Sequence, residues 1–447
     1  MKRNKSSYFV GIAFICIIAA FFGSVIFRFY RAQVYFDYGN TSARSEISAP
    51  SASAATESVW VKEYPFDEDE KFSYDRKTEN VPQTVQTQTT VSKKTEYLTY
   101  VNWFKNSVDY YTTKLLPGRM KYVEANALFS KTVGMKIIAG TDSVAVMKNG
   151  YLTFESAPAD TSEAVESVKW FSDEMKKRNI DFSYVQYPSK EDKNDEQLPD
   201  GVVDYSNKNA DSLLAGLEEN GVNYLDMRTL LSQKDSDWYS CFFKTDHHWK
   251  PETGVWASGK IAEMLNGKFG YSLDTDIGNL ENYNVDVYEK YCLGSQGKIA
   301  TLTYAAPEDI SLIYPKKSTS FTVQYDNDAA KTGAFEDVMF NRNYLNKDYY
   351  NNSAYSTYIN GNKVITRIEN NDCKNGKRIL IIGGSYNKCV VPYLSQDFES
   401  TELLDRRYFD GSILNYIDKT KPNVVLVAYT PTLISDASTH SSTFNFE

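Results

Sequence analysis

The chain has 447 residues, of which 42% are hydrophobic and 14% aromatic, and its formal net charge at pH 7 is -9. This apolar content excludes a disordered chain, because it is ample for a packed core. The negative charge argues against a nucleic-acid-binding protein, since neutralising phosphates requires a basic surface. At roughly 150 residues per domain, the length favours two or three domains. We therefore expect a globular protein without a nucleic-acid partner.

An uncharged apolar run occupies residues 8–27. Its length suits a helix that crosses a hydrocarbon core of roughly 30 Å. Basic residues in segment 1–7 precede the run, so the positive-inside rule keeps that segment cytoplasmic and places the rest of the chain outside. A cleaved signal peptide is the alternative, but its apolar core spans only ~7–15 residues and is followed by small residues. We predict an uncleaved signal anchor in a single-pass protein of the cell membrane.

Residues 28–96 are rich in Ser, Ala, Thr and Gln without an apolar period, which predicts a flexible extracytoplasmic linker. A folded domain is expected over 97–430, followed by a polar tail over 431–447. Inside the domain, residues from about 268 to 375 are rich in Tyr and Asn and have only short apolar runs. We expect an irregular insertion there. The four cysteines after the span match no zinc or redox motif, so disulfides are allowed but not required.

The expected elements begin with helical spacing over residues 103–115 and a second helix that continues through 128. A hairpin over 142–154 follows, because Asn149-Gly150 accepts the positive φ of a tight turn. A helix is then expected to begin near 160–163 at a capping residue followed by Glu. Strand and helix patterns alternate afterwards, which predicts a parallel sheet covered on both faces. The ranges in this alternation are 180–187, 210–219, 222–226 and 251–265, followed by apolar strands over 378–382, 401–408 and 424–429.

Histidine is scarce, with only His247, His248 and His440 in the chain. Asp246 lies two residues before His248, and Pro251 suits the first turn of the following helix. This spacing offers a base and its orienting carboxylate at one junction between a loop and a helix. A metal site formed by Asp246, His247 and His248 is the weaker alternative, because no other histidine lies nearby to add a ligand. We therefore expect no metal.

Ser385 follows a buried-strand pattern and two glycines, Gly383 and Gly384. Functional groups collect at the carboxyl ends of strands in open α/β sheets. Glycines there let the backbone turn sharply and bring N–H groups toward a reacting oxygen. Ser385 is therefore the candidate nucleophile, and His248 is the candidate base that would activate it.

With these residues assembled, the chain resembles the DHHW-motif protein family, which is related to the alginate O-acetyltransferase-like branch of the SGNH-hydrolase-like superfamily. The resemblance covers roughly Tyr97 to Tyr429. It implies an α/β fold, namely an SGNH-hydrolase-like three-layer α/β/α sandwich with a mainly parallel sheet, preceded by the transmembrane helix and the linker. The motifs that carry it are Lys244-Thr245-Asp246-His247-His248-Trp249, the strand-Gly-Gly-Ser385-Tyr386 turn, Leu116-Pro117-Gly118-Arg119, Pro188-Ser189-Lys190 and Leu293-Gly294-Ser295-Gln296-Gly297.

The resemblance also implies roles: Asp246 orients His248, His248 is the general base and Ser385 is the nucleophile. The Asp-x-His pair precedes the serine, as in the alginate branch and unlike ordinary SGNH esterases. The Gly-Gly-Ser-Tyr context departs from the Gly-Asp-Ser of those enzymes, and no block matches the one that supplies a side-chain oxyanion donor. Asn387 is the candidate for that role. Supporting roles are expected for His247, Gly384, Asn387 and Trp249. His247 is expected to pack or bond locally, and Trp249 is expected to pack, with the lining of an acyl or sugar pocket as its alternative.

An acyl-serine can pass its acyl group to a sugar hydroxyl or to water, so transferases and esterases share the first half-reaction. Our main expectation is a bacterial, membrane-anchored extracytoplasmic O-acetyltransferase that acts on a cell-envelope polysaccharide and needs no cofactor. Because acetyl donors arise in the cytoplasm, this enzyme would require a multi-spanning membrane partner that passes the acyl group across. The alternatives are a non-catalytic polysaccharide-binding or assembly protein and a carbohydrate esterase.

Overall fold

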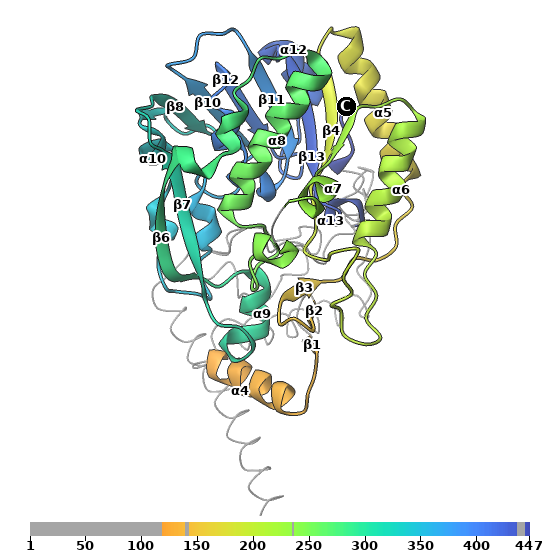
Figure 1. Ribbon diagram of the computed structural model, residues 1–447, viewed down its shortest axis with the longest axis vertical. Helices are drawn as coiled ribbons and strands as arrows, with labels where there is room; N and C mark the ends of the chain where they lie inside the picture. The colour runs from red at the N-terminus through yellow and green to blue at the C-terminus, as the bar shows by residue number, and fades with distance from the viewer. Residues whose placement is uncertain (1–118, 139–142, 235–236, 436–442) are drawn as a thin grey trace, which may run out of the picture. The chain divides into compact units, whose positions relative to one another are not determined.

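The computed structural model describes residues 119–138, 143–234, 237–435 and 443–447 (Figure 1). The expected membrane span, the linker and His440 lie outside these residues. Within the part of the chain that is described, no helix combines the length and apolarity needed to cross a membrane. The described residues from 127 onward belong to one compact unit, and that unit contains all of the candidate site.

The centre of this unit is an eight-stranded sheet in the order β5-β4-β13-β11-β12-β10-β8-β9. The first five strands are mutually parallel, whereas β10, β8 and β9 each pair with their neighbours in antiparallel fashion. The sheet is therefore mixed: its larger part is parallel, as expected, and three antiparallel strands extend it. A short hairpin joins β8 to β9, and such a connection allows only antiparallel pairing. The strands are β4 (Asp181–Gln186), β5 (Tyr224–Asp226), β8 (Phe321–Tyr325), β9 (Lys331–Gly333), β10 (Ile365–Asn370), β11 (Arg378–Gly383), β12 (Ser400–Leu404) and β13 (Val424–Tyr429).

The central strands are the ones with continuous apolar sequence. Every residue of β13 is buried, and so are five of the six residues of β11. Successive side chains of β11 point to opposite faces of the sheet, so Ile379 and Ile381 join one hydrophobic cluster while Leu380 and Ile382 join another. This two-sided burial is what the apolar runs predicted.

Helices cover both faces of the sheet and produce the expected three layers (Figure 1). On one face, α5 packs through the apolar stripe predicted for it, which is Val165, Val168, Phe171 and Met175. On the other face, α8 and α11 pack against Ile379 and Ile381. The first face carries α5 (Ser162–Lys177), α6 (Ser206–Glu219), α12 (Ile413–Thr420) and α13 (Thr432–Ser435), and the second carries α8 (Pro251–Phe269) and α11 (Val391–Leu394).

Two boundaries differ from expectation for identifiable reasons. Helix α8 does not stop before Gly267 but continues to Phe269, where Gly270 adopts a left-handed conformation with φ of 73°. A glycine ends a helix only where the backbone needs that conformation, and Gly267 lies inside the helix. Strand β12 ends at Leu404, earlier than expected, because Asp405 turns the chain and pairs with Arg407.

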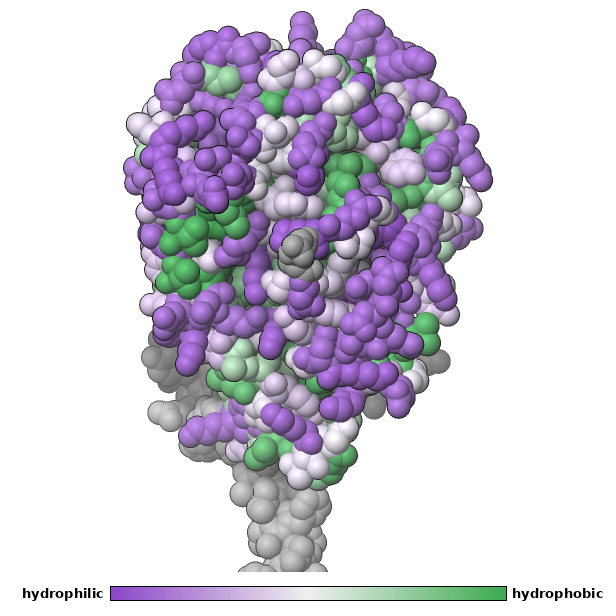
Figure 2. Space-filling view, viewed as in Figure 1, coloured by the Kyte–Doolittle hydropathy of each residue, from purple (hydrophilic) through white to green (hydrophobic). Residues whose placement is uncertain are grey.

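Segment 268–375, expected to be irregular, supplies three strands of the main sheet and a separate two-stranded ribbon, β6 (Tyr283–Cys292) and β7 (Glu308–Pro315). Figure 2 shows an apolar patch over this ribbon, where Val285 and Val287 are 43% and 56% exposed. The hairpin expected over 142–154 forms as β2 and β3. The other elements are α4 (Arg119–Thr132), β1 (Ile137–Ile138), β2 (Val144–Val146), β3 (Leu152–Phe154), α7 (Met227–Ser232), η3 (Trp238–Cys241), η4 (Thr275–Gly278), η5 (Leu280–Asn282), α9 (Ser295–Tyr304), α10 (Phe335–Val338), η6 (Arg342–Tyr344), η7 (Ala354–Thr357) and η8 (Ser385–Cys389).

Candidate active site

The two histidines lie on a short loop that connects η3 to α8. The loop is closed at its base by a bridge between Phe242 and Trp249 and by a hydrogen bond from Lys250 N to Cys241 O of 2.8 Å. Pro251 occupies the first turn of α8, as the sequence predicted, and its missing N–H costs nothing there. The loop therefore holds Asp246 and His248 rigidly at the start of a long buried helix.

The structure brings Asp246, His248 and Ser385 together in one hydrogen-bonded chain. His248 Nδ1 lies 2.6 Å from Asp246 Oδ1, and His248 Nε2 lies 2.7 Å from Ser385 Oγ. Asp246 and His248 are almost fully buried, and Ser385 is 8% exposed. One ring nitrogen thus faces the carboxylate and the other faces the hydroxyl, which is the arrangement in which a carboxylate fixes the tautomer of a base that takes a serine proton.

The carboxyl group of Asp246 is held in its ionised form. Burial alone would raise its pKa, but the positive charge that the His248 and His247 rings carry when protonated, together with the hydrogen bonds from His248, outweighs burial and lowers that pKa well below its usual range. The Ser295 N–H donates to the second carboxylate oxygen at 3.3 Å. An ionised acceptor that is bonded on both oxygens can orient the imidazole without becoming protonated itself.

Two residues of the 268–375 segment hold the histidine loop, and sequence reasoning missed both. The Glu308 carboxylate accepts hydrogen bonds from Lys244 N, Thr245 N and Thr245 Oγ1 at 2.7–2.8 Å. Gly294 approaches so closely that a Cβ added there would collide with Asp246. Gly294 belongs to a motif that the sequence had singled out, but nothing local indicated its partner. Glu308 had no sequence signal of its own.

Ser385 begins η8 directly at the carboxyl end of β11, where the sequence placed it. The turn is braced by Asn387, whose Nδ2 donates to Gly384 O and Ala428 O at 3.1 and 3.2 Å. Its Oδ1 accepts from the Tyr187 hydroxyl at 2.7 Å, and the side chain is fully buried. Because its amide group is directed at protein partners, Asn387 supports the turn, and the oxyanion role expected for it does not fit this geometry.

Gly384 is half-buried and lies beside the guanidinium group of Arg407. A Cβ added at Gly384 would lie 3.4 Å from Nη2 of Arg407. Arg407 forms a two-point ion pair with Asp405, with distances of 2.9 and 2.6 Å, at the carboxyl end of the adjacent strand β12. A positively charged guanidinium therefore lies beside the nucleophile turn, and no local sequence signal indicated it.

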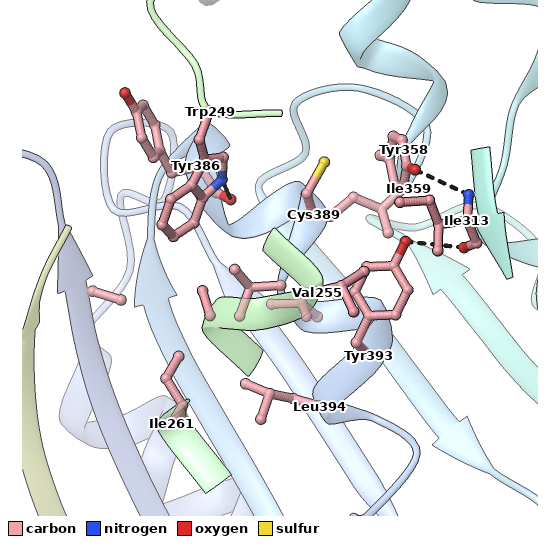
Figure 3. Close-up of a cluster of buried hydrophobic side chains, with 14 of the residues drawn as sticks. Trp249, Val255, Ile261, Ile313, Tyr358, Ile359, Tyr386, Cys389, Tyr393 and Leu394 are labelled. Atoms are coloured by element: carbon pink, nitrogen blue, oxygen red, sulfur yellow. Dashed lines mark hydrogen bonds between the residues drawn. The ribbon is translucent and has the colours of Figure 1, made fainter. Parts of the chain in front are cut away.

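Trp249 joins the histidine loop to the nucleophile turn. Its Nε1 donates to Tyr386 O at 3.2 Å (Figure 3). Its ring centroid lies 4.8 Å from that of Tyr187. The Tyr386 hydroxyl in turn donates to His247 O. Trp249 is fully buried, and its ring packs against Tyr187 and Tyr386.

His247 is adjacent to His248 but contacts Ser295 through its ring. Its Nδ1 lies 2.9 Å from Ser295 Oγ and 3.3 Å from Asp246 Oδ1, and its side chain is 21% exposed. Single ligand atoms of Asp246, His247 and His248 lie within 4.8 Å of one another, so these residues could in principle hold a metal ion. A metal that bound His248 would have to displace Asp246 or Ser385 from a ring nitrogen, which makes the cluster fit acid–base chemistry better than metal binding.

A family model described as "SGNH hydrolase-like domain, acetyltransferase AlgX" matches residues 147–341. The family resemblance predicted from the sequence is confirmed. The SGNH hydrolase-like match contains Asp246 and His248 and ends before Ser385. Because the matched family is an acetyltransferase domain, it also confirms the expectation of an enzyme of the acyltransferase or esterase class. No curated protein gives a significant sequence match.

Solved structures support the SGNH hydrolase-like fold. Bacillus cereus PatB1 with a sulfonyl adduct is 21% identical, with a TM-score of 0.57, over 69% of this chain and 99% of that chain. A DHHW family protein from Eubacterium siraeum is 19% identical, with a TM-score of 0.52, over 68% of this chain and 95% of that chain. At these identities the likeness establishes the fold alone.

Proposed function

We propose that this protein is a membrane-anchored, extracytoplasmic O-acetyltransferase that modifies a cell-envelope polysaccharide through Ser385, His248 and Asp246. The observation that carries the proposal is the position of the His248 ring, with Asp246 at 2.6 Å on one nitrogen and Ser385 at 2.7 Å on the other. The family match to an acetyltransferase domain supports the choice of acyl transfer.

In the first half-reaction Ser385 Oγ attacks the carbonyl carbon of the acetyl donor. The hydroxyl proton moves to His248 Nε2, and Asp246 stabilises the imidazolium that results. The bond between the acyl carbon and the leaving group then breaks, and His248 returns its proton to the departing group. The enzyme is left with an acetyl ester on Ser385 and a neutral imidazole.

In the second half-reaction a sugar hydroxyl of the polysaccharide attacks the acetyl-serine. Its proton passes to His248 Nε2, and His248 then protonates Ser385 Oγ as the ester bond to the enzyme breaks. The products are an acetylated sugar and the free serine. Water in place of the sugar would give an esterase, which is the alternative that shares the same residues.

The location of the protein in the cell membrane is proposed from the apolar run at residues 8–27. As a signal anchor, this apolar run would hold the catalytic domain outside the membrane, and a multi-spanning membrane partner would supply the acetyl group from the cytoplasm. Alkaline extraction of membranes from cells that produce the whole chain is the test. Recovery of the chain in the soluble fraction would contradict the anchor.

The catalytic proposal is tested by the Ser385→Ala variant with a chromogenic acetyl ester. We expect the whole chain in detergent to release the chromophore and the variant to lose about 10⁴-fold or more in kcat/KM. The melting temperature should be unchanged, because the substitution removes one hydroxyl. Ser258→Ala on α8 is the matched control, since Ser258 is a fully buried serine outside the triad, and it should keep its activity.

A covalent probe gives a second readout. PatB1 is described with a sulfonyl adduct, and a sulfonyl fluoride should likewise label this chain at Ser385, detected as a mass increase on the peptide that contains it. Equal hydrolysis by wild type and Ser385→Ala would contradict the triad, and absence of both hydrolysis and labelling would favour the non-catalytic alternative. Adding oligosaccharides and detecting acetylated sugar by mass spectrometry separates a transferase from an esterase.

A further inference from the structure

The imidazole of His248 lies against two other rings, those of Tyr355 and His247. The phenol ring of Tyr355 stacks on one side, with centroids 4.0 Å apart and planes inclined by 17°. The ring of His247 lies at 3.8 Å with an inclination of 36°. Tyr355 is fully buried and comes from η7, inside the segment expected to be irregular. Its ring is thus the most nearly parallel neighbour of the proposed base.

The environment of Tyr355 keeps this ring in place. Phe243, from the histidine loop, meets it edge-on with centroids 6.3 Å apart and planes at 90°. The Tyr355 hydroxyl lies near the Cys389 thiol but does not satisfy the geometry of a hydrogen bond. The Lys388 ammonium lies over the same ring, 5.7 Å from its centroid. The centroid of the His248 imidazole is nearer, at 4.0 Å. Tyr355 therefore presents the face of its ring to His248. Its hydroxyl forms no hydrogen bond with the described residues.

We propose that Tyr355 is a positioning residue that holds the His248 ring in its reactive orientation and stabilises the imidazolium. This inference rests on the proposed function. The face of an aromatic ring carries partial negative charge and attracts a cation that lies over it. His248 becomes a cation only after the Ser385 proton reaches Nε2, so the attraction is stronger in the transition state than in the resting enzyme. Such an interaction raises kcat and leaves substrate binding unchanged.

The experiment compares three substitutions in the whole chain in detergent, assayed with a chromogenic acetyl ester. Tyr355→Leu removes the ring, and we expect kcat to fall about 3- to 30-fold with little change in KM. Tyr355→Phe keeps the ring face and should restore kcat to near the wild-type value. Tyr358→Leu is the matched control, because Tyr358 is an equally buried tyrosine three residues away whose hydroxyl bonds to Ile313 N and Ser311 O. It should lower the melting temperature without the loss of kcat.

If Tyr355→Leu does not fold, Tyr355→Met fills more of the volume without an aromatic face and takes its place. Wild-type kcat in Tyr355→Leu or Tyr355→Met would overturn the inference, and so would an equal loss in Tyr355→Phe or in Tyr358→Leu. These results are distinguishable from failure of the proposed function. If the proposed function is wrong, Ser385→Ala keeps its activity. If only the role of Tyr355 is wrong, Ser385→Ala is still inactive.

Discussion

The adjacent histidines have different partners because they occupy adjacent positions of a tight turn. Both ring nitrogens of His248 lie within hydrogen-bonding distance of the other members of the proposed triad. His247 instead contacts Ser295 at the start of α9 and is partly exposed. The same side-chain chemistry therefore serves as a base at one position and as local support at the next.

This difference predicts unequal effects for two identical substitutions. His248→Gln removes the group that accepts the Ser385 proton, so we expect kcat for ester hydrolysis to fall about 10⁴-fold or more. His247→Gln keeps a polar group near Ser295 and should lower kcat by less than about tenfold, because it leaves the proton acceptor in place. Steady-state kinetics on both variants is the measurement. Similar losses in the two would mean that His247 also takes part in proton transfer.

The position of the proposed base depends on how closely α8 lies against the nucleophile turn. Gly254 faces Cys389 at the end of η8, and a Cβ added at Gly254 would collide with the Cys389 carbonyl. Figure 3 shows α8 crossing this region beside Cys389 and Tyr393. A glycine in the helix interior costs stability by itself, so the close contact is the physical reason for its presence.

The same helix offers a matched pair of glycine substitutions. Gly254→Ala should lower the free energy of unfolding by about 1–3 kcal/mol, because α8 must move away from η8. Activity should fall as well, since the movement separates His248 from Ser385. Gly267→Ala has no atom within 4 Å of the added Cβ and should raise the free energy of unfolding by about 0.5–1 kcal/mol. Chemical denaturation and kinetics check both, and a stable, active Gly254→Ala variant would contradict this view of the interface.

Sequence reasoning identified the elements whose signals are local. The apolar runs that became β11 and β13 and the Asp-x-His spacing before a proline all lie within a few residues. Residues that support the site from a distance carry no such signal. Glu308, Gly294 and Tyr355 lie in a segment without an apolar period, and their roles appear only when folding brings them to Asp246 or His248. The antiparallel strands of the sheet were missed for the same reason, since they arise from that segment.

At the scale of the whole molecule, two adjacent buried ionisable residues, Lys190 and Glu191, connect several parts of the fold. Lys190 Nζ donates to Leu152 O at 2.5 Å and to Gln296 Oε1 at 2.6 Å, which links the loop after β4 to β3 and α9. The neighbouring Glu191 accepts from the Thr153 hydroxyl. Burial raises the pKa of Glu191 to about 8, and the charge of Asp204 adds to this effect. Burial lowers the pKa of Lys190 to about 8.

These pKa values predict how stability depends on pH. In the unfolded chain Glu191 titrates near its ordinary pKa of 4.5, so between about pH 4.5 and 8 the folded state binds more protons than the unfolded state. The free energy of unfolding should therefore fall as pH rises through this range. Above about pH 8 the lowered pKa of Lys190 has the opposite effect, because the folded state then binds fewer protons at Lys190 than the unfolded state, and the free energy of unfolding rises with pH. Glu191→Gln cannot ionise and should flatten the decline, so that the variant gains stability relative to wild type at pH 8.

Melting temperatures of wild type and Glu191→Gln measured from pH 5 to 8 check this prediction. Glu166→Gln on α5 is the matched control, because Glu166 is exposed to solvent and should leave the pH profile of wild type unchanged. Parallel profiles for wild type and Glu191→Gln would show that Glu191 is already ionised in the folded protein.

The order of strands in the sheet has a consequence for synthesis of the chain. Gln186 of β4 and Tyr429 of β13 are neighbours in the sheet but lie 243 residues apart, and the proposed base and nucleophile lie 137 residues apart. Contacts at such separations form slowly, because a long loop must close before they stabilise anything. The central strand β13 leaves the ribosome after the other seven strands of the sheet. Until it emerges, β4 and β11 have an unfilled place between them, and the unpaired edges of these two strands are exposed to aggregation.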